Sequence, residues 1–160
     1  MTALKSLFFL IFVPGLLVGY IPFAFLLTGP LVDTGLLSLP TLPIWLVGGV
    51  MILWCFWDFL IKGKGTPAPF DPPRELVVTG LYNYVRNPMY VGVEMMLVGH
   101  YLWFGYWLLL GYAAFLFLAF HASILFYEEP TLKKKFGRSY ENYLKTVPRW
   151  IPLLKRAGER

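Results

Sequence analysis

The chain of 160 residues is 58% hydrophobic, 19% aromatic and only 14% charged, with a net charge of +5. A soluble domain averages about 45–50% apolar and about 25% charged residues, so this composition excludes an ordinary soluble domain and favours an integral membrane protein. The single cysteine, Cys55, excludes an intrachain disulfide and a cysteine-based metal site.

The first part of the chain predicts two membrane-spanning helices, over residues 4–27 and 44–61. Each run holds about the 20 apolar residues that cross a bilayer at about 1.5 Å per residue. Pro14 and Pro22 are expected to kink the first helix. This run is longer than the core of a signal peptide and no small-x-small cleavage site closes it, so we expect a retained helix.

A polar loop over residues 62–84 leads into an apolar stretch of residues 89–127. One helix of that length would far exceed the membrane. Gly105, flanked by aromatic residues, permits a sharp turn. The sequence therefore predicts a tight hairpin of two further spans, over residues 89–102 and 107–127.

The chain from Glu128 onward predicts one amphipathic helix that Pro148 ends. Its apolar positions recur at helical spacing and basic side chains stand between them. The apolar positions are Leu132, Phe136, Tyr140, Tyr143 and Leu144. We expect this helix to lie on the membrane surface or against the polar loop.

These elements together predict an all-α polytopic membrane protein in one compact domain. It has four transmembrane helices, the last two a tight helical hairpin, plus a C-terminal amphipathic cytosolic helix. Basic residues are absent from residues 28–41 and concentrate in the polar loop and the tail. By the positive-inside rule, both termini and the polar loop lie on the cytoplasmic side. Nucleic-acid binding is excluded as an interpretation, since it needs these basic residues on a soluble surface.

Placing an ionisable residue in an apolar membrane helix costs free energy, and such residues usually face the protein interior. His121 and Glu128 are seven residues apart, which places them on one face of an α-helix. They form either a polar wall of a ligand cavity or a structural pair with groups on a neighbouring helix. Glu94, one turn after Tyr90, either lines the same cavity or pairs with a basic residue. The two histidines lack the short spacing of a metal site, so no metal is expected.

Polar and aromatic residues crowd the stretch from Gly80 to Gly92, where the polar loop meets the third span. Tyr82, Tyr84 and Tyr90 offer faces for stacking or for a cation. The alternative interpretation of these tyrosines is an interfacial aromatic belt. With Glu128 and Glu129 on the same side of the membrane, the cluster is able to hold a zwitterionic aromatic cofactor.

Four motifs in order give the chain a resemblance to the isoprenylcysteine carboxyl methyltransferase family, which belongs with the membrane phospholipid methyltransferases. They are Gly80-Leu-Tyr-x-x-x-Arg-Asn-Pro-x-Tyr-x-Gly92, Glu128-Glu129, Phe136-Gly-x-x-Tyr140-x-x-Tyr143 and Val147-Pro-Arg-x-Ile-Pro152. The resemblance covers about residues 67–152. Residues 1–61, with the two N-terminal transmembrane helices, resemble the family only in being apolar, and residues 62–160 are expected to form the catalytic part.

The resemblance further implies a membrane methyltransferase that uses S-adenosylmethionine on the cytosolic side. Residue types at Arg74 and Glu75 differ from those of the family, so the resemblance gives only weak support for a cofactor contact at these two positions. The positions that match the cofactor contacts are Leu76, Val77, Tyr82, Asn87, Pro88, Met89, Tyr90 and Glu128. A base is needed only for a protonated acceptor, and Glu129 and His121 are the candidates.

Two positions depart from the family pattern. Asn87 replaces the usual histidine and keeps a donor and an acceptor. Ile124 stands where relatives that methylate a prenylcysteine carboxylate have an arginine, so that acceptor requires Arg86 or Arg149 as a substitute.

We expect a lipophilic or lipid acceptor that enters from the bilayer. The alternatives are a non-enzymatic scaffold or ligand-binding protein, and less favourably a transporter or channel subunit.

Overall fold

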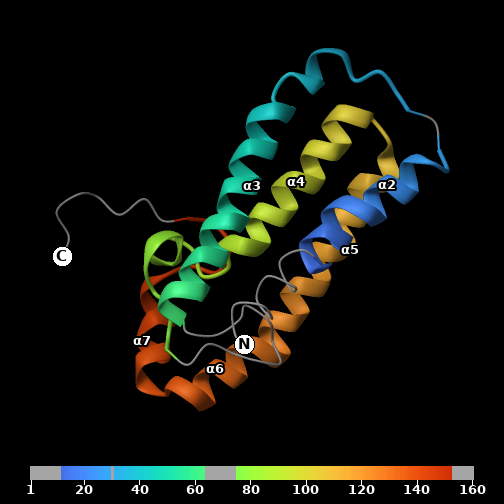
Figure 1. Ribbon diagram of the computed structural model, residues 1–160. Coiled ribbons are helices and arrows are strands. Elements are labelled where there is room, and N and C mark those ends of the chain that lie inside the picture. The colour runs from blue at the N-terminus through green and yellow to red at the C-terminus, as the bar shows by residue number, and fades with distance from the viewer. Residues whose placement is uncertain (1–11, 30, 64–74, 153–160) are drawn as a thin grey trace.

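A computed structural model describes residues 12–29, 31–63 and 75–152. The described residues form helices joined by loops and contain no strand (Figure 1). The first half contains η1 (Gly15–Tyr20), α2 (Ile21–Leu26), η2 (Gly35–Ser38), α3 (Thr41–Asp58) and η3 (Phe59–Gly63). The second half contains η4 (Gly80–Asn83), α4 (Pro88–Phe104), α5 (Trp107–Ser123), η5 (Ile124–Glu128), α6 (Glu129–Phe136) and α7 (Arg138–Thr146). The predicted all-α class is confirmed for the described residues.

Helices lie at the described part of each predicted span. The helical runs Gly35–Ile61 and Trp107–Phe136 are long and apolar enough to cross a membrane, and Phe12–Leu26 is a shorter apolar helix. The helix α4 has 17 residues, which at about 1.5 Å per residue is about 25 Å. That all of these helices cross a bilayer remains a prediction.

Two π-helical segments each precede a proline near the start of the next α-helix. The segment η1 precedes Pro22, and η5 precedes Pro130. Proline has no backbone N–H, and its ring clashes with the carbonyl four residues before it, so the regular α-helical bonding cannot continue through that turn. Because η5 is still helical, the backbone runs from Trp107 to Phe136 without a break.

The C-terminal region differs from the single amphipathic helix that the sequence predicts. The helix ends at Phe136 and a second one starts at Arg138. Gly137 between them has φ 52° and ψ −129°, a conformation that side chains strongly disfavour. The break folds α7 back toward the rest of the protein, so that Tyr140 is 4% exposed.

The hairpin between α4 and α5 confirms the predicted turn. Gly105 has φ 66° and ends α4, and α5 begins two residues later. The preceding loop is pinned over this turn, since the Val32 N–H donates to the Phe104 carbonyl at 3.2 Å. The Thr34 hydroxyl also donates to the Leu102 carbonyl at 2.7 Å.

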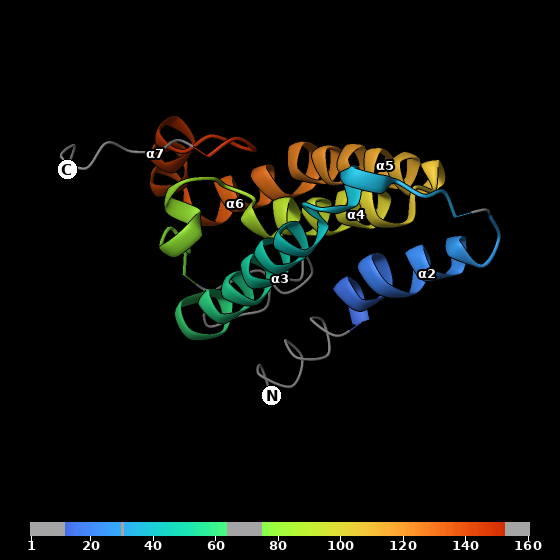
Figure 2. The same ribbon diagram turned by 90° about the horizontal axis from the view of Figure 1, so that it is seen from above.

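The helix α4 packs against α3 on one side and α5 on the other (Figures 1 and 2). At the α3–α4 crossing two glycines meet, and a Cβ on Gly92 would lie 2.8 Å from the Gly48 carbonyl oxygen. Small residues let helix backbones approach closely, and such contacts drive helix association in membranes. This crossing sets the position of the N-terminal half of α4, which carries Tyr90.

We expect Gly92→Leu to destabilise the folded protein by several kcal/mol, because the new side chain would overlap the Gly48 backbone. Gly49→Leu is the matched control, since a Cβ at Gly49 meets no atom within 4 Å. Thermal unfolding of both variants in detergent measures the difference. Equal melting temperatures for the two variants would show that the glycine contact does not hold α3 against α4.

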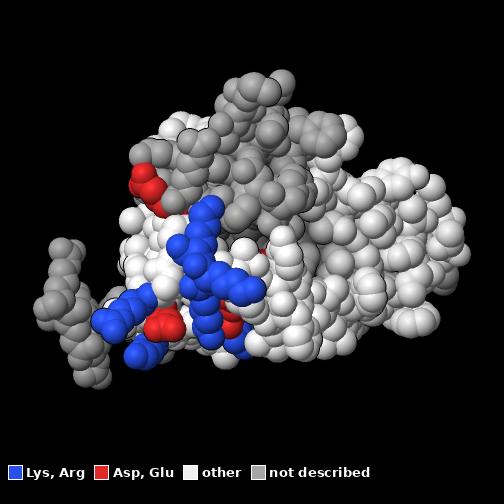
Figure 3. Space-filling view, turned by 90° about the horizontal axis from the view of Figure 1, so that it is seen from below, with Lys and Arg blue, Asp and Glu red and all other residues white. Residues whose placement is uncertain are grey.

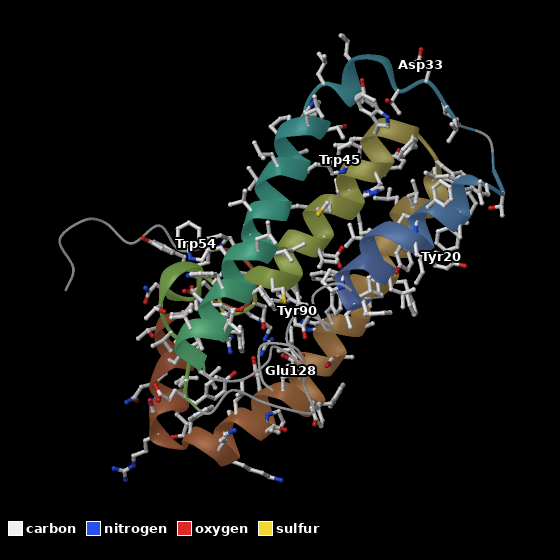
Figure 4. All side chains as sticks on the ribbon, viewed as in Figure 1. Tyr20, Asp33, Trp45, Trp54, Tyr90 and Glu128 are labelled. Carbon is white, nitrogen blue, oxygen red and sulfur yellow. The ribbon has the colours of Figure 1, made fainter. Side chains whose placement is uncertain are left out.

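Exposed basic side chains gather at the end of the molecule formed by α6 and α7 (Figure 3). They are Lys133, Lys134, Lys135, Arg138 and Lys145. The opposite end, at the loop before α3, carries Asp33 (Figure 4). The charge asymmetry of the sequence is therefore an asymmetry between the two ends of the helix assembly.

Candidate functional site

A cavity lies where α4 begins and where η4, η5, α6 and α7 meet. Ten residues that the sequence predicts as site residues line it: Leu76, Val77, Tyr82, Arg86, Asn87, Met89, Tyr90, Ile124, Glu128 and Glu129. Three predicted residues do not line it. Pro88 is buried in the first turn of α4, and His121 and Arg149 lie outside the lining.

The carboxyl group of Glu128 reaches across to α4 (Figure 4). Its Oε1 accepts a hydrogen bond from the Tyr90 hydroxyl at 2.5 Å and another from the Ser123 hydroxyl at 3.2 Å. The Tyr90 ring stacks on Phe120 with centroids 4.4 Å apart, which fixes the phenol direction. Both donors are neutral, and among the described residues no lysine or arginine forms an ion pair with Glu128. The described residues thus leave this carboxylate without a cationic partner.

The neighbouring carboxylate, Glu129, is already paired with two guanidinium groups. Arg86 Nη1 lies 2.8 Å from Oε1, and Arg149 donates from Nε to Oε1 at 2.9 Å and from Nη2 to Oε2 at 3.1 Å. Glu129 is only 9% exposed, so these charge-assisted bonds lie largely out of water. Both oxygens are engaged, which disfavours the predicted role of Glu129 as a base.

The two arginines were predicted as substitutes for the missing substrate arginine. Their guanidinium groups instead hold Glu129, and a substrate carboxylate would have to compete with it. Burial raises the pKa of Tyr140, and the Arg86 guanidinium, which also lies near Tyr140, lowers that pKa by a smaller amount. Its buried Nε has no hydrogen-bond partner among the described residues, and the side chain lines the cavity. One donor of Arg86 is thus without a partner among the described residues.

The segment after α7 is held against the start of α4. The Arg86 N–H donates to the Pro148 carbonyl at 2.9 Å, and Asn87 Nδ2 donates to the Arg149 carbonyl at 3.1 Å. Asn87 therefore uses its side-chain amide to hold this segment. The asparagine that stands in place of the usual histidine still supplies the donor for this bond. We call the Arg86–Glu129–Arg149 ion pairs together with these two bonds the C-terminal clasp.

His121 does not share the cavity wall with Glu128. Its Nδ1 accepts a hydrogen bond from Trp150 Nε1 at 3.1 Å, and its ring stacks on Phe117. The π-helical segment between His121 and Glu128 is the reason, because a turn closed by i→i+5 bonds shifts the two residues out of α-helical phase. The observed partner of His121, Trp150, lies in the segment after α7 and not on a neighbouring helix, so His121 has a structural contact that differs from both interpretations.

The tyrosines of the cavity act as neutral donors. Tyr143 donates its hydroxyl to the Tyr82 carbonyl at 2.7 Å. Burial raises the pKa of Tyr140 to about 12 and also raises the pKa values of Tyr82 and Tyr143. Because burial disfavours the phenolate form, these side chains stay protonated at neutral pH. They supply hydroxyl groups and ring faces without adding charge.

Several lining residues were not predicted as site residues. Phe59 and Phe120 add aromatic walls, and Tyr140 and Tyr143 come from a motif whose role was not assigned. Phe120 precedes Ile124 by one helical turn, a spacing that places both on one face. Ile124 is 1% exposed and provides an apolar surface at the position of the family arginine. Among the residues that the structure describes, no cluster of three or more potential metal ligands occurs.

Comparison with known proteins gives two matches. Residues 40–139 match the phospholipid methyltransferase family. The Protein-S-isoprenylcysteine O-methyltransferase of Schizosaccharomyces pombe is 37% identical over 79 residues, which are 49% of this chain and 34% of that protein. The chain thus matches about a third of the length of this relative. No solved structure matches the chain. Because the family match covers more than half of the residues, the chain belongs to the phospholipid methyltransferase family.

Proposed function

We propose that the protein is an integral membrane methyltransferase that uses S-adenosylmethionine and modifies a lipophilic or membrane-associated acceptor. The family supports the reaction class. The observation that carries the proposal is the unequal pairing of two adjacent carboxylates. Glu129 is paired with two arginines, whereas Glu128 receives only neutral hydroxyl donors among the described residues.

The cavity fits a zwitterionic ligand with an aromatic part. Glu128 offers a carboxylate for an ammonium group, and the remaining donor of Arg86 suits a ligand carboxylate. Tyrosine and phenylalanine rings favour stacking and interaction with a cation, which contributes about 0.5–2 kcal/mol. The residues that would hold the cofactor are Leu76, Val77, Tyr82, Asn87, Met89, Tyr90 and Glu128.

When bound, S-adenosylmethionine supplies a methyl group that its positively charged sulfur already activates. The chain then has to bind the cofactor and the acceptor, orient them and exclude water. Alignment of the reacting groups alone can supply a large part of the rate enhancement. Tyr90 and Phe120 form a stacked wall, and Ile124 keeps an adjoining surface apolar. The C-terminal clasp keeps α6 and the segment after α7 against the start of α4.

The acceptor is proposed to be lipophilic because the cavity adjoins the apolar helices and Ile124 contributes no charge. The relative from Schizosaccharomyces pombe is named for an isoprenylcysteine acceptor. For this chain, Arg86 and Arg149 hold Glu129, and the one remaining donor of Arg86 is the one we propose for the cofactor carboxylate, so no further arginine of the described cavity is left for an acceptor carboxylate. An acceptor that carries no carboxylate at its reacting end is therefore the better fit.

We further propose that all four apolar helices cross the membrane and that the α6–α7 end faces the cytoplasm. Exposed lysine and arginine side chains on that end support this orientation, since basic residues concentrate on the cytoplasmic side of membrane proteins. The cavity lined by Tyr90 and Glu128 is at the same end, where both residues are labelled in Figure 4. A soluble cytoplasmic cofactor would then reach it without crossing the bilayer.

Incubating the purified protein with methyl-labelled S-adenosylmethionine and a membrane lipid extract tests the proposal. The expected result is label in an organic-soluble product, lost with Glu128→Ala and kept with Glu141→Ala, an exposed carboxylate on α7. Saturable binding of the cofactor without transfer to any acceptor would instead indicate a ligand-binding protein. Absence of both binding and transfer would overturn the proposal.

A further inference from the structure

The helix α4 presents two different faces to two different cavities. Tyr90 and Val93 point to the cavity described above, and Val93 also belongs to the buried core. A second cavity, the α4 groove, lies on another face of the same helix. Its lining residues are Ile44, Val91, Glu94, Met95, Val98, Phe117 and Trp150. Glu94 thus lines a separate cavity and not the one that holds Tyr90 and Glu128.

Glu94 is the only ionisable side chain of the α4 groove in the described structure. Its Oε1 is buried and has no hydrogen-bond partner among the described residues. Burying a polar group without a partner costs roughly 1–3 kcal/mol, and more for a charged one. Ionisable residues within membrane helices therefore have partners and mark functional sites. For Glu94 Oε1 the described residues do not supply that partner.

Two aromatic rings stand in the same groove as this carboxylate. Phe117 and Trp150 lie with ring centroids 4.8 Å apart, and both line the α4 groove. The hydrogen bond from Trp150 Nε1 to His121 fixes the indole in place. A carboxylate beside aromatic faces is the arrangement that binds organic ammonium groups, through charge and through cation–π attraction.

The other lining residues of the α4 groove are apolar. From Val91 to Val98 the helix rises about 10 Å at about 1.5 Å per residue. Met95 and Val98 continue the groove toward Ile44 of α3. Aliphatic walls of this length suit an alkyl chain that lies along the helix, beyond the carboxylate.

We propose that the α4 groove is a second binding site, which takes a lipophilic amine: an alkyl chain that ends in an ammonium group. The ammonium group pairs with Glu94 and lies against Phe117 and Trp150, and the chain follows Met95, Val98 and Ile44. The site is on a different face of α4 from the proposed cofactor cavity. It does not depend on the chain being a methyltransferase.

A photoreactive long-chain alkylamine, added to the full-length protein in detergent, tests this site by cross-linking and peptide mapping. We expect saturable labelling of the α4 stretch 91–98 and of Phe117. An unlabelled alkylamine should suppress the labelling, whereas the alcohol of the same chain length should require at least a tenfold higher concentration. Glu94→Gln should abolish this preference for the amine, and Glu141→Gln should keep it.

Phe117→Leu provides a second variant, which keeps the carboxylate and removes one aromatic face. It is expected to weaken amine competition by about threefold to tenfold, in line with a cation–π contribution of about 0.5–1.5 kcal/mol. Equal competition by amine and alcohol in the wild-type protein would overturn the proposal. So would labelling spread evenly over the apolar surface, or an amine preference that survives in Glu94→Gln. Because the readout is cross-linking, the result is independent of cofactor binding and methyl transfer.

Discussion

Replacing Glu128 with glutamine is expected to weaken the binding of S-adenosylmethionine about 10- to 100-fold. Hydrogen bonds and pairs that involve a charged group contribute about 1.5–3 kcal/mol, which corresponds to this range. Glutamine keeps an oxygen that can accept from Tyr90 and Ser123, as Glu128 Oε1 does. The substitution therefore removes the charge offered to the ligand and little else. Isothermal titration calorimetry in detergent measures the change.

The control for this prediction is Glu141→Gln, which removes the same charge from an exposed position on α7. It should leave the affinity unchanged, and both variants should keep the melting temperature of the wild-type protein without ligand. Unchanged affinity in Glu128→Gln would show that this carboxylate does not bind the cofactor.

Replacing Glu129 with alanine is expected to act on stability, with a loss of about 3–5 kcal/mol in the free energy of unfolding. The substitution leaves Arg86 and Arg149 without their carboxylate, and their side chains are only 13% and 26% exposed. A buried charge that has lost its partner is among the most destabilising changes known for single substitutions. Denaturant unfolding in detergent, followed by circular dichroism, measures the loss.

Two comparisons separate this effect from a general loss of surface charge. Glu141→Ala should change stability by less than about 0.5 kcal/mol, as exposed positions usually do. Arg149→Leu should cost less than Glu129→Ala, because the ion pair between Arg86 and Glu129 remains. If the Glu129→Ala protein is as stable as the Glu141→Ala control, the C-terminal clasp does not stabilise the fold.

The fold was predictable where local residue chemistry decides it. Gly105 between aromatic residues indicated the α4–α5 turn, and the long apolar runs indicated the helices. The break at Gly137 was not predicted, because Leu132, Phe136, Tyr140 and Tyr143 keep helical spacing across it. Periodicity reports the buried face of each segment, and it does not report a change in direction between two segments that bury the same face.

The sequence indicated many residues that line one cavity, and it indicated their pairings less well; the binding role of that cavity stays a prediction. Motif order placed ten lining residues in one cavity, but it did not distinguish Glu128 from Glu129. Adjacent residues on a helix point about 100° apart, so the two carboxylates meet different partners that only the tertiary structure defines. His121 was misplaced because the proline at position 130 is accompanied by a π-helical turn, which α-helical spacing does not anticipate.

A structure of the protein with bound S-adenosylmethionine tests the central claim most directly. The account predicts that the cofactor lies in the cavity between the start of α4, α6 and α7. Its ammonium group would then contact Glu128, and the Arg86–Glu129–Arg149 ion pairs would remain intact. A cofactor bound elsewhere, or bound in this cavity with Glu128 still contacting only Tyr90 and Ser123, would contradict it.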